Sequence, residues 1–384
     1  MEGLDKMTPK LIETLFNELR PERKREKLPK SVIDKVIKDI NKIKKIPYKK
    51  KDWKDLFWSK NPYENNGALT IDIPRVEIKE VKNKDWKGKV VFYTPERCVK
   101  EGFKFINKSC VITHNGEILA VYIKGETDDA VNVAVKSLRR MIDKVEVYYP
   151  VKEKTFYSGF KLTRGSATER EKKEATYQTQ SRKEKDKYQG KNWLDGMIKY
   201  FKGTSGGHTG TIVTYQPREV DAIKDKEFLY DLVYSYGALH ELEKRYSPAI
   251  ANYRYELAKN ANFPSAFPNF PLEKHPATTC GSSVDFASAI HNDSGLEGVT
   301  ESIIWNKCRE GEHQFFVSPD IKIVFDLSKD NALILQPPKI AHGTINTGNH
   351  GGIGIVNITK ENLVNETELN KLYYSLHKKY SNTH

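Results

Sequence analysis

The sequence predicts an α+β fold in which a barrel or jelly roll of short strands packs with helices. Five short runs rich in β-branched and aromatic residues lie between residues 264 and 358, at the close spacing typical of such a core. Alternating apolar and polar runs also occupy residues 68–150, and apolar residues recur at helical spacing in residues 1–60 and 218–260. The 384 residues are enough for two or three domains.

The composition argues against several classes of protein. No apolar stretch approaches the roughly 18–20 residues that a membrane span needs, so no membrane partner is expected. The N-terminus has no long apolar segment, so a secretory signal is not expected. The 41 aromatic residues (16 Phe, 20 Tyr and 5 Trp) are too many for a disordered chain. Four separated cysteines argue against a disulfide scaffold or a Cys-rich zinc site and predict a reducing compartment; they are Cys98, Cys110, Cys280 and Cys308.

The charge balance favours a polyanionic partner. Lys and Arg number 64 against 51 Asp and Glu, a formal net charge of +13. An excess of this size is typical of proteins that bind nucleic acid, although it is also compatible with solvated lysine-rich surfaces. Residues 1–60 hold 18 basic and 10 acidic residues, so more than half of the excess lies there.

Residues 1–65 are predicted to form a basic helical region. Apolar residues at i, i+3 and i+4 predict one helix over residues 11–20 and a second over residues 31–46, with Ser31 as its N-cap. Three interpretations of this region remain open. It is an arm that contacts DNA, a nuclear-import signal, or a helical pair that packs on the rest of the protein.

Residues 66–163 are predicted to be a mixed region that forms part of the catalytic fold. The Asn-Gly pair inside HNGE, residues 114–117, predicts a hairpin turn between two strands. Residues 128–142 have helical spacing, with Asp128 or Asp129 near the start, and the run DKVEVYYP at residues 143–150 has the alternation of a strand.

The rest of the chain divides into an insertion and a core. Residues 164–212 are polar and poor in aliphatic side chains, which predicts a mobile insertion; its glycines lack the GKS or GKT of a phosphate-binding loop. Residues 213–384 are predicted to hold helices and the strand core. Gly237 and Pro248 should interrupt the helix over residues 218–260, and a final helix is expected in the tail.

The most informative site motif is His291-Asn292-Asp293. Side chains alternate along a strand, so His291 and Asp293 at a strand end share one face. His342 follows 51 residues later, after two prolines. Two histidines and one carboxylate form the facial triad of non-haem Fe(II) oxygenases, which leaves positions for a co-substrate and O2. His114, His240, His275 and His313 have no comparable partner pattern and are not expected to be ligands.

The region from Tyr246 to Lys360 resembles the TET/JBP family of nucleic-acid base oxygenases. The matching features are YSPAIANYRYELA, the aromatic and proline-rich FPSAFPNFP, the strand into HND, HQFFV, IKIVFDL, NALILQP and the distal histidine. The resemblance implies a double-stranded β-helix core and a nuclear enzyme, with iron held by His291, Asp293 and His342. It also implies oxidation of the methyl group of 5-methylcytosine or thymine in DNA after the base is flipped out of the duplex.

One departure from the family concerns the co-substrate. Members that use 2-oxoglutarate have an arginine about ten residues after the distal histidine, whereas here that position falls in His350-Gly351-Gly352-Ile353-Gly354. Lys322 or His350 could replace the arginine. Alternatively, the co-substrate is ascorbate, as in a TET-related algal enzyme class that transfers a glyceryl group to 5-methylcytosine, and glycines such as Gly352 make room for its ring. The glycines are also compatible with a simple bulge, or with an inactive site.

Substrate recognition is less well defined by the sequence. The family often places an acidic residue shortly after the H-x-D motif, and Glu297 is the candidate here, although a surface carboxylate is an equally good interpretation. The expected partner is methylated DNA, bound by a monomer. Two other hypotheses remain open: a non-catalytic nucleic-acid-binding protein with a vestigial iron site, and an oxygenase that acts on RNA or protein.

Overall fold

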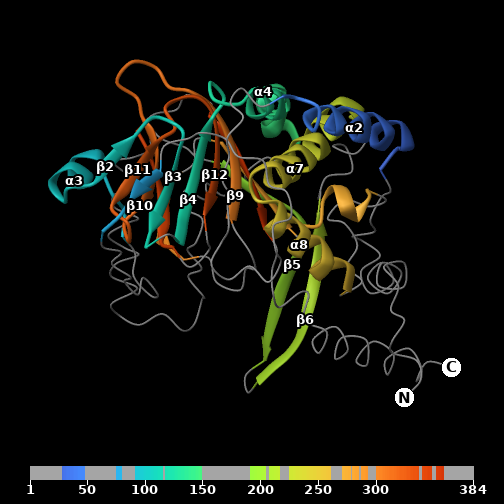
Figure 1. Cartoon of the computed structure of the whole chain (residues 1–384). Helices are drawn as coiled ribbons and strands as arrows, with labels where there is room; N and C mark the ends of the chain where they lie inside the picture. The colour runs from blue at the N-terminus through green and yellow to red at the C-terminus, as the bar shows by residue number, and fades with distance from the viewer. Residues whose placement is uncertain are drawn as a thin grey trace.

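A computed structural model of the chain describes thirteen segments: residues 28–47, 75–79, 91–115, 117–148, 191–204, 207–216, 225–260, 270–277, 279–284, 287–292, 300–336, 340–347 and 352–358. Two β-sheets and a layer of helices dominate them. The larger sheet lies between the smaller sheet and the helices α2, α4 and α7 (Figure 1). No helix in these segments is long and apolar enough to cross a membrane.

The larger sheet has nine strands. Their spatial order is β1 (Arg75–Glu77), β3 (Cys110–His114), β4 (Glu117–Lys124), β12 (Lys329–Gln336), β9 (Thr300–Lys307), β14 (Ile353–Ile358), β7 (Thr279–Val284), β5 (Lys191–Thr204) and β6 (Gly207–Gln216). Apart from the parallel pair β1–β3, neighbouring strands are antiparallel. The hairpin β5–β6 extends well beyond the other strands (Figure 1).

The smaller sheet has five strands. Their order is β2 (Lys104–Ile106), β11 (Ile323–Asp326), β10 (Gln314–Ser318), β13 (His342–Asn346) and β8 (Ser288–His291). From β7 onward the chain passes repeatedly between the sheets. Strands β7, β9, β12 and β14 belong to the larger sheet, whereas β8, β10, β11 and β13 belong to the smaller one. This alternation brings residues that are far apart in sequence to facing positions between the sheets.

The helices pack mainly on the outer face of the larger sheet. They are α2 (Lys30–Ile43), α4 (Asp129–Tyr148), α7 (Lys226–Tyr246) and α8 (Pro248–Asn260), with the 3-10 helix η2 (Leu272–Lys274) beside them and the short α3 (Pro95–Lys100) at the smaller sheet. Alternation along β12 shows the two faces of the sheet. Leu333 and Leu335 join the core under the helices, whereas Ala332 and Ile334 join a second core that faces the smaller sheet.

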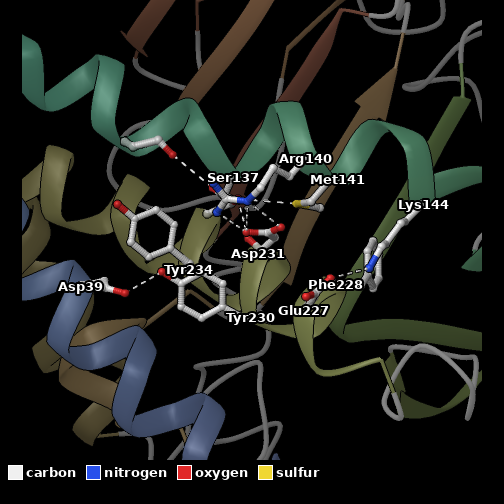
Figure 2. Close-up of polar contacts among 12 residues, drawn as sticks. Asp39, Ser137, Arg140, Met141, Lys144, Glu227, Phe228, Tyr230, Asp231 and Tyr234 are labelled. Atoms are coloured by element: carbon white, nitrogen blue, oxygen red, sulfur yellow. Dashed lines mark hydrogen bonds and ion pairs between the residues drawn. The ribbon is translucent and has the colours of Figure 1, made fainter.

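Polar contacts fix the helices to one another. In Figure 2, Arg140 of α4 reaches Asp231 of α7, and its Nε lies 3.0 Å from Oδ1 of that carboxylate. The hydroxyl of Tyr230 on α7 donates to Asp39 of α2 at 2.7 Å. Burial raises the pKa of the Asp231 carboxyl, and the hydrogen bond from Arg140 opposes that rise.

Several elements agree with the sequence predictions. The hairpin β3–β4 forms at the predicted Asn-Gly turn, and Asn115 takes the left-handed conformation that such turns use (φ 49°). The Asp128 carboxylate accepts from the N–H of Ala130 at the start of α4. The amphipathic helix predicted over residues 31–46 is α2, which begins one residue earlier. Its apolar face is buried against α7, so packing is shown for this part of the basic N-terminal region.

Other predictions are wrong in ways that have physical reasons. Ser31 is not the N-cap of α2, because Pro29 holds that position without a side-chain cap hydrogen bond. Gly237 does not interrupt α7, although a break does follow Tyr246, before Pro248. Residues 143–148, predicted as a strand, extend α4 instead, because α4 packs along α7.

Two further predictions concern loops and strand breaks. Residues 191–204 and 207–212, predicted as part of a mobile insertion, lie in β5 and β6. β5 pairs with β7 of the larger sheet, and β6 pairs with β5. The run from Ser282 to His291, predicted as one strand, divides into the end of β7 and β8, which belong to different sheets. The helices predicted over residues 11–20 and in the tail lie outside the described residues.

Candidate metal centre

His291 and His342 meet on neighbouring strands of the smaller sheet. His291 is the last residue of β8, His342 is the first of β13, and the two are paired in register. Their ring centroids are 4.6 Å apart. His342 is buried and His291 is half-buried. The fold therefore places together two imidazoles that are 51 residues apart in the sequence.

A β-bulge next to the pair directs His291. The register runs from Ser288 opposite Thr344 to His291 opposite His342, so three steps on β8 match two on β13. In a regular strand Ser288 and His291 would point to opposite faces, because side chains alternate. The extra residue removes this conflict. The Ser288 hydroxyl lies 3.0 Å from the Thr344 hydroxyl, while the His291 ring faces His342.

The surroundings of His342 define its tautomer. Its Nδ1 lies 3.1 Å from the carbonyl oxygen of Ile340, and the ring stacks on Phe316 at a centroid distance of 5.2 Å. A carbonyl oxygen can only accept, so this contact is a hydrogen bond in the tautomer whose proton is on Nδ1. The lone pair is then on Nε2, which is the arrangement that metal-ligating histidines commonly use.

Buried polar side chains surround this histidine. Gln336, at the end of β12, accepts at Oε1 from the Ser318 hydroxyl (2.8 Å) and donates from Nε2 to the Ile340 carbonyl (3.0 Å). The carboxylate of Asp320 accepts from the N–H of Ala341 at 3.0 Å. Sequence reasoning missed Gln336, Ser318 and Asp320. The available signal was a glutamine ending the apolar strand NALILQ, at a position whose alternation points between the sheets.

The donor set fits a metal ion as far as the described residues allow. Two imidazoles that face each other on neighbouring strands suit Fe(II), which also binds a carboxylate in facial triads. Asp293, the predicted third ligand, lies outside the described residues. Among the described segments, which do not include Asp293, no group of three or more metal-binding side chains occurs.

The predicted co-substrate and base-recognition residues fall into two groups. Glu297 and His350 lie outside the described residues. Lys322 is exposed in the β10–β11 turn, with φ of 53°, and its ammonium donates to the carbonyl oxygen of Glu101 at the end of α3 (3.1 Å). This contact does not support a role for Lys322 in binding a co-substrate. Gly352 is buried immediately before β14.

Gly354 of β14, and Gly352 just before that strand, lie on the side of the larger sheet away from the helices. Ile353 and Ile355 join the core under the helices, so alternation places Gly352 and Gly354 on the opposite side, between the sheets. Gly354 is partly exposed although its strand is paired on both sides, with β7 and β9.

Each of the four histidines that were not expected to be ligands has a structural partner among the described residues. His240 contacts the Glu243 carboxylate at 3.0 Å, and His275 contacts the Asn357 side chain at 3.0 Å. Burial lowers the pKa of His275 to about 3. His114 bonds the Ile78 carbonyl oxygen, and His313 stacks on Phe315, which belongs to a separate apolar cluster of the smaller sheet.

Comparisons with known proteins give little further information. No family model matches the chain, and no curated protein matches its sequence. Among solved structures, the chain is similar to NgTET1 in complex with 5mC DNA, with a TM-score of 0.42 and 9% identity over 86% of this chain and 90% of that chain. A likeness at this level does not by itself establish a shared fold or a shared activity.

Proposed function

We propose that this protein is an Fe(II)-dependent dioxygenase that oxidises the methyl group of 5-methylcytosine, or of thymine, in DNA. The observation that carries the proposal is the register pair His291–His342, with Asp293 two residues after His291 in the sequence. The eight strands β7 to β14 are divided equally between the two sheets, which supports a double-stranded β-helix core, a jelly-roll arrangement. Together they support the facial triad that the family resemblance implies.

The chain's own residues have three tasks in this proposal. His291, Asp293 and His342 hold the iron, and the proton on Nδ1 of His342 keeps its Nε2 available as a donor atom. Bound iron supplies the activation of O2 that oxidation of a methyl C–H bond requires. Basic side chains bind the phosphates, and the target base leaves the duplex because its methyl group is not accessible to the metal inside the stack.

The charge distribution supports a nucleic-acid substrate. The net charge is +13, and α2 presents exposed lysines outward while its apolar residues pack on α7. Outward lysines on an element fixed in the fold are suited to phosphate contacts. Binding of DNA by a protein with a vestigial iron site would give the same salt dependence, so iron content must separate the two hypotheses.

A direct test combines iron content with product analysis. The protein is reconstituted anaerobically with Fe(II) and incubated with a duplex containing 5-methylcytosine, and the nucleosides are identified by mass spectrometry. His291→Ala, Asp293→Ala and His342→Ala should each lose iron and product while keeping the circular dichroism of the wild type. His313→Ala is the matched control, because that ring stacks on Phe315 away from the pair. Full activity with unchanged iron in Asp293→Ala would refute the ligand assignment.

The same assay identifies the co-substrate. Reactions with 2-oxoglutarate and with ascorbate, each supplied alone, distinguish oxidation of the base from transfer of a glyceryl group. Gly352→Arg adds volume between the sheets, so it should impair a reaction that depends on ascorbate. The Lys322 ammonium bonds the end of α3, so Lys322→Ala should leave the apparent affinity for 2-oxoglutarate unchanged. A loss of that affinity in Lys322→Ala would show that the lysine replaces the missing arginine.

A further inference from the structure

The side chain of Gln336, in the larger sheet, reaches the smaller sheet next to the histidine pair. It ends β12 and is 1% exposed. Ala332 and Ile334, four and two residues earlier, belong to the core between the sheets, and the period of two places Gln336 on the same side. Its neighbours across the gap are Ser318 of β10 and the segment that leads into β13.

The hydrogen bonds of Gln336 are determined by what its partners can do. The Ile340 carbonyl can only accept, so the amide nitrogen of Gln336 must face it, at 3.0 Å. The amide oxygen then faces the Ser318 hydroxyl, which donates at 2.8 Å. The same carbonyl oxygen accepts from Nδ1 of His342 at 3.1 Å. A carbonyl oxygen has two lone pairs, so it can accept both bonds at once.

We propose that Gln336 is a positioning residue for His342, holding the Ile340 carbonyl so that Nδ1 stays protonated and Nε2 is directed at the metal. The proposal rests on the proposed function, because it concerns the ligand that the iron site requires. Nε2 of Gln336 also lies 3.4 Å from Nδ1 of His342. Without the bond from Gln336, the Ile340 carbonyl is no longer held next to Nδ1, and the Nδ1–H tautomer loses its fixed acceptor.

The expected size of the effect follows from the role of such partners. Residues that orient a ligating histidine through its second nitrogen change metal affinity by about 10–100-fold when they are removed. Gln336→Met keeps the length of the side chain and removes both polar atoms. Ser318→Ala removes only the hydroxyl that anchors the amide oxygen, so its effect on metal affinity should be smaller.

Tyr122 provides a matched control for the loss of a buried bond between the sheets. It is a fully buried residue of β4 in the larger sheet, and its hydroxyl donates to the carbonyl oxygen of Asp326 in the smaller sheet at 2.6 Å. Asp326 pairs with Phe315, near the start of β10, whereas Ser318 ends that strand. Tyr122→Phe therefore removes a comparable hydrogen bond at the opposite end of the strand.

The test measures metal affinity, stability and tautomer on the full-length chain. Co(II) is titrated into the metal-free wild type, Gln336→Met, Ser318→Ala and Tyr122→Phe by isothermal calorimetry, and thermal unfolding is recorded for each. Gln336→Met should bind Co(II) about 10–100-fold more weakly. Tyr122→Phe should lose stability and keep the wild-type affinity. Equal affinity in Gln336→Met and the wild type, or an equal loss in Tyr122→Phe, would overturn the proposal.

Nitrogen NMR of the metal-free proteins separates this inference from the proposed function. The His342 signals should report the Nδ1–H tautomer in the wild type and a mixture with the Nε2–H tautomer in Gln336→Met. A wild type that binds no Co(II) would refute the iron site, and the tautomer would still show whether Gln336 controls His342. An unchanged tautomer in Gln336→Met would refute the positioning role, whatever the metal affinity.

Discussion

The close approach of α2 to α7 makes Gly237 a sensitive position. A Cβ added to Gly237 would overlap Cδ1 of Ile40, and the next atoms would be Cγ1 of Ile40 at 3.5 Å and Cε1 of Phe270 at 3.7 Å. Ile40 is completely buried. The glycine in the middle of a continuous helix therefore has a packing reason, and Gly237→Ala tests it.

Two opposing effects determine the sign of this substitution. Alanine in a helix interior is favoured over glycine by about 1 kcal/mol. Overpacking a filled core costs about 1–3 kcal/mol, and Ile40 is enclosed, so its terminal methyl group has little room to move. We expect Gly237→Ala to lower the free energy of unfolding by about 1 kcal/mol, the midpoint of the overpacking range less the gain in propensity.

A double-mutant cycle with Ile40→Val isolates the contact. Valine lacks Cδ1, so its single substitution should cost about 0.5–1.5 kcal/mol. In that background Gly237→Ala should become stabilising by about 1 kcal/mol, because only the helix propensity remains. Urea unfolding followed by circular dichroism measures all four proteins. A stabilising Gly237→Ala in the wild-type background would refute the close packing of the two helices.

Three further predictions concern charge. Because burial lowers the pKa of His275 to about 3, the unfolded chain binds a proton below about pH 6.5 that the folded protein does not. Stability should therefore fall as the pH drops from about 6.5 to 3, by up to about 1.4 kcal/mol per pH unit from this residue, and urea midpoints for His275→Asn should show a flatter slope. The lysine surface of α2 is tested by replacing three exposed lysines with glutamine: Lys30 and Lys38 of α2, and Lys45 just after it. The slope of log affinity for DNA against log salt concentration should become less steep, by up to about 0.9 for each phosphate that these lysines neutralise. An unchanged slope would exclude this surface from the DNA interface. Arg140→Ala should cost about 1–3 kcal/mol by removing the donor to the nearly buried Asp231 carboxylate, and Asp231→Asn in that background should recover part of the stability.

Local patterns in the sequence were good predictors where local physics decides the structure. The Asn-Gly turn and the helical spacing of α2 are properties of a few neighbouring residues, and both are confirmed. The division of residues 282–291 between two sheets was not predicted, because alternation is the same whichever sheet a strand joins. The bulge at Ser288 has the same origin: it is defined by pairing with Thr344, which lies 56 residues away.

The histidine pair shows what can be predicted from residue types and their spacing in the sequence. His291 and His342 were selected for their residue types and separation, and the structure places them together. Gln336 was not selected, because a glutamine at the end of a strand is usually solvated. Its role depends on Ser318 and Ile340, which the fold brings to it from other strands and turns. Residue type and spacing therefore predicted which histidines the fold brings together, but not the buried polar residues that contact them.

The central helix α7 explains why the basic N-terminal region cannot be treated as a detachable arm. Three of its carboxylates are buried, and each is met by a cation from a different element: Asp231 by Arg140 of α4, Glu241 by Lys44 after α2, and Glu243 by Arg254 of α8. Since α7 also packs on β14 and β9, the helix layer supports the sheet that carries Gly352 and Gly354.

Removing residues 1–60 would remove α2 and expose α7, so a loss of DNA binding in such a truncation would not identify a phosphate-binding residue. Substitution of exposed lysines on an intact α2 avoids that ambiguity, because it changes the charge of the surface and leaves the buried face of the helix in place.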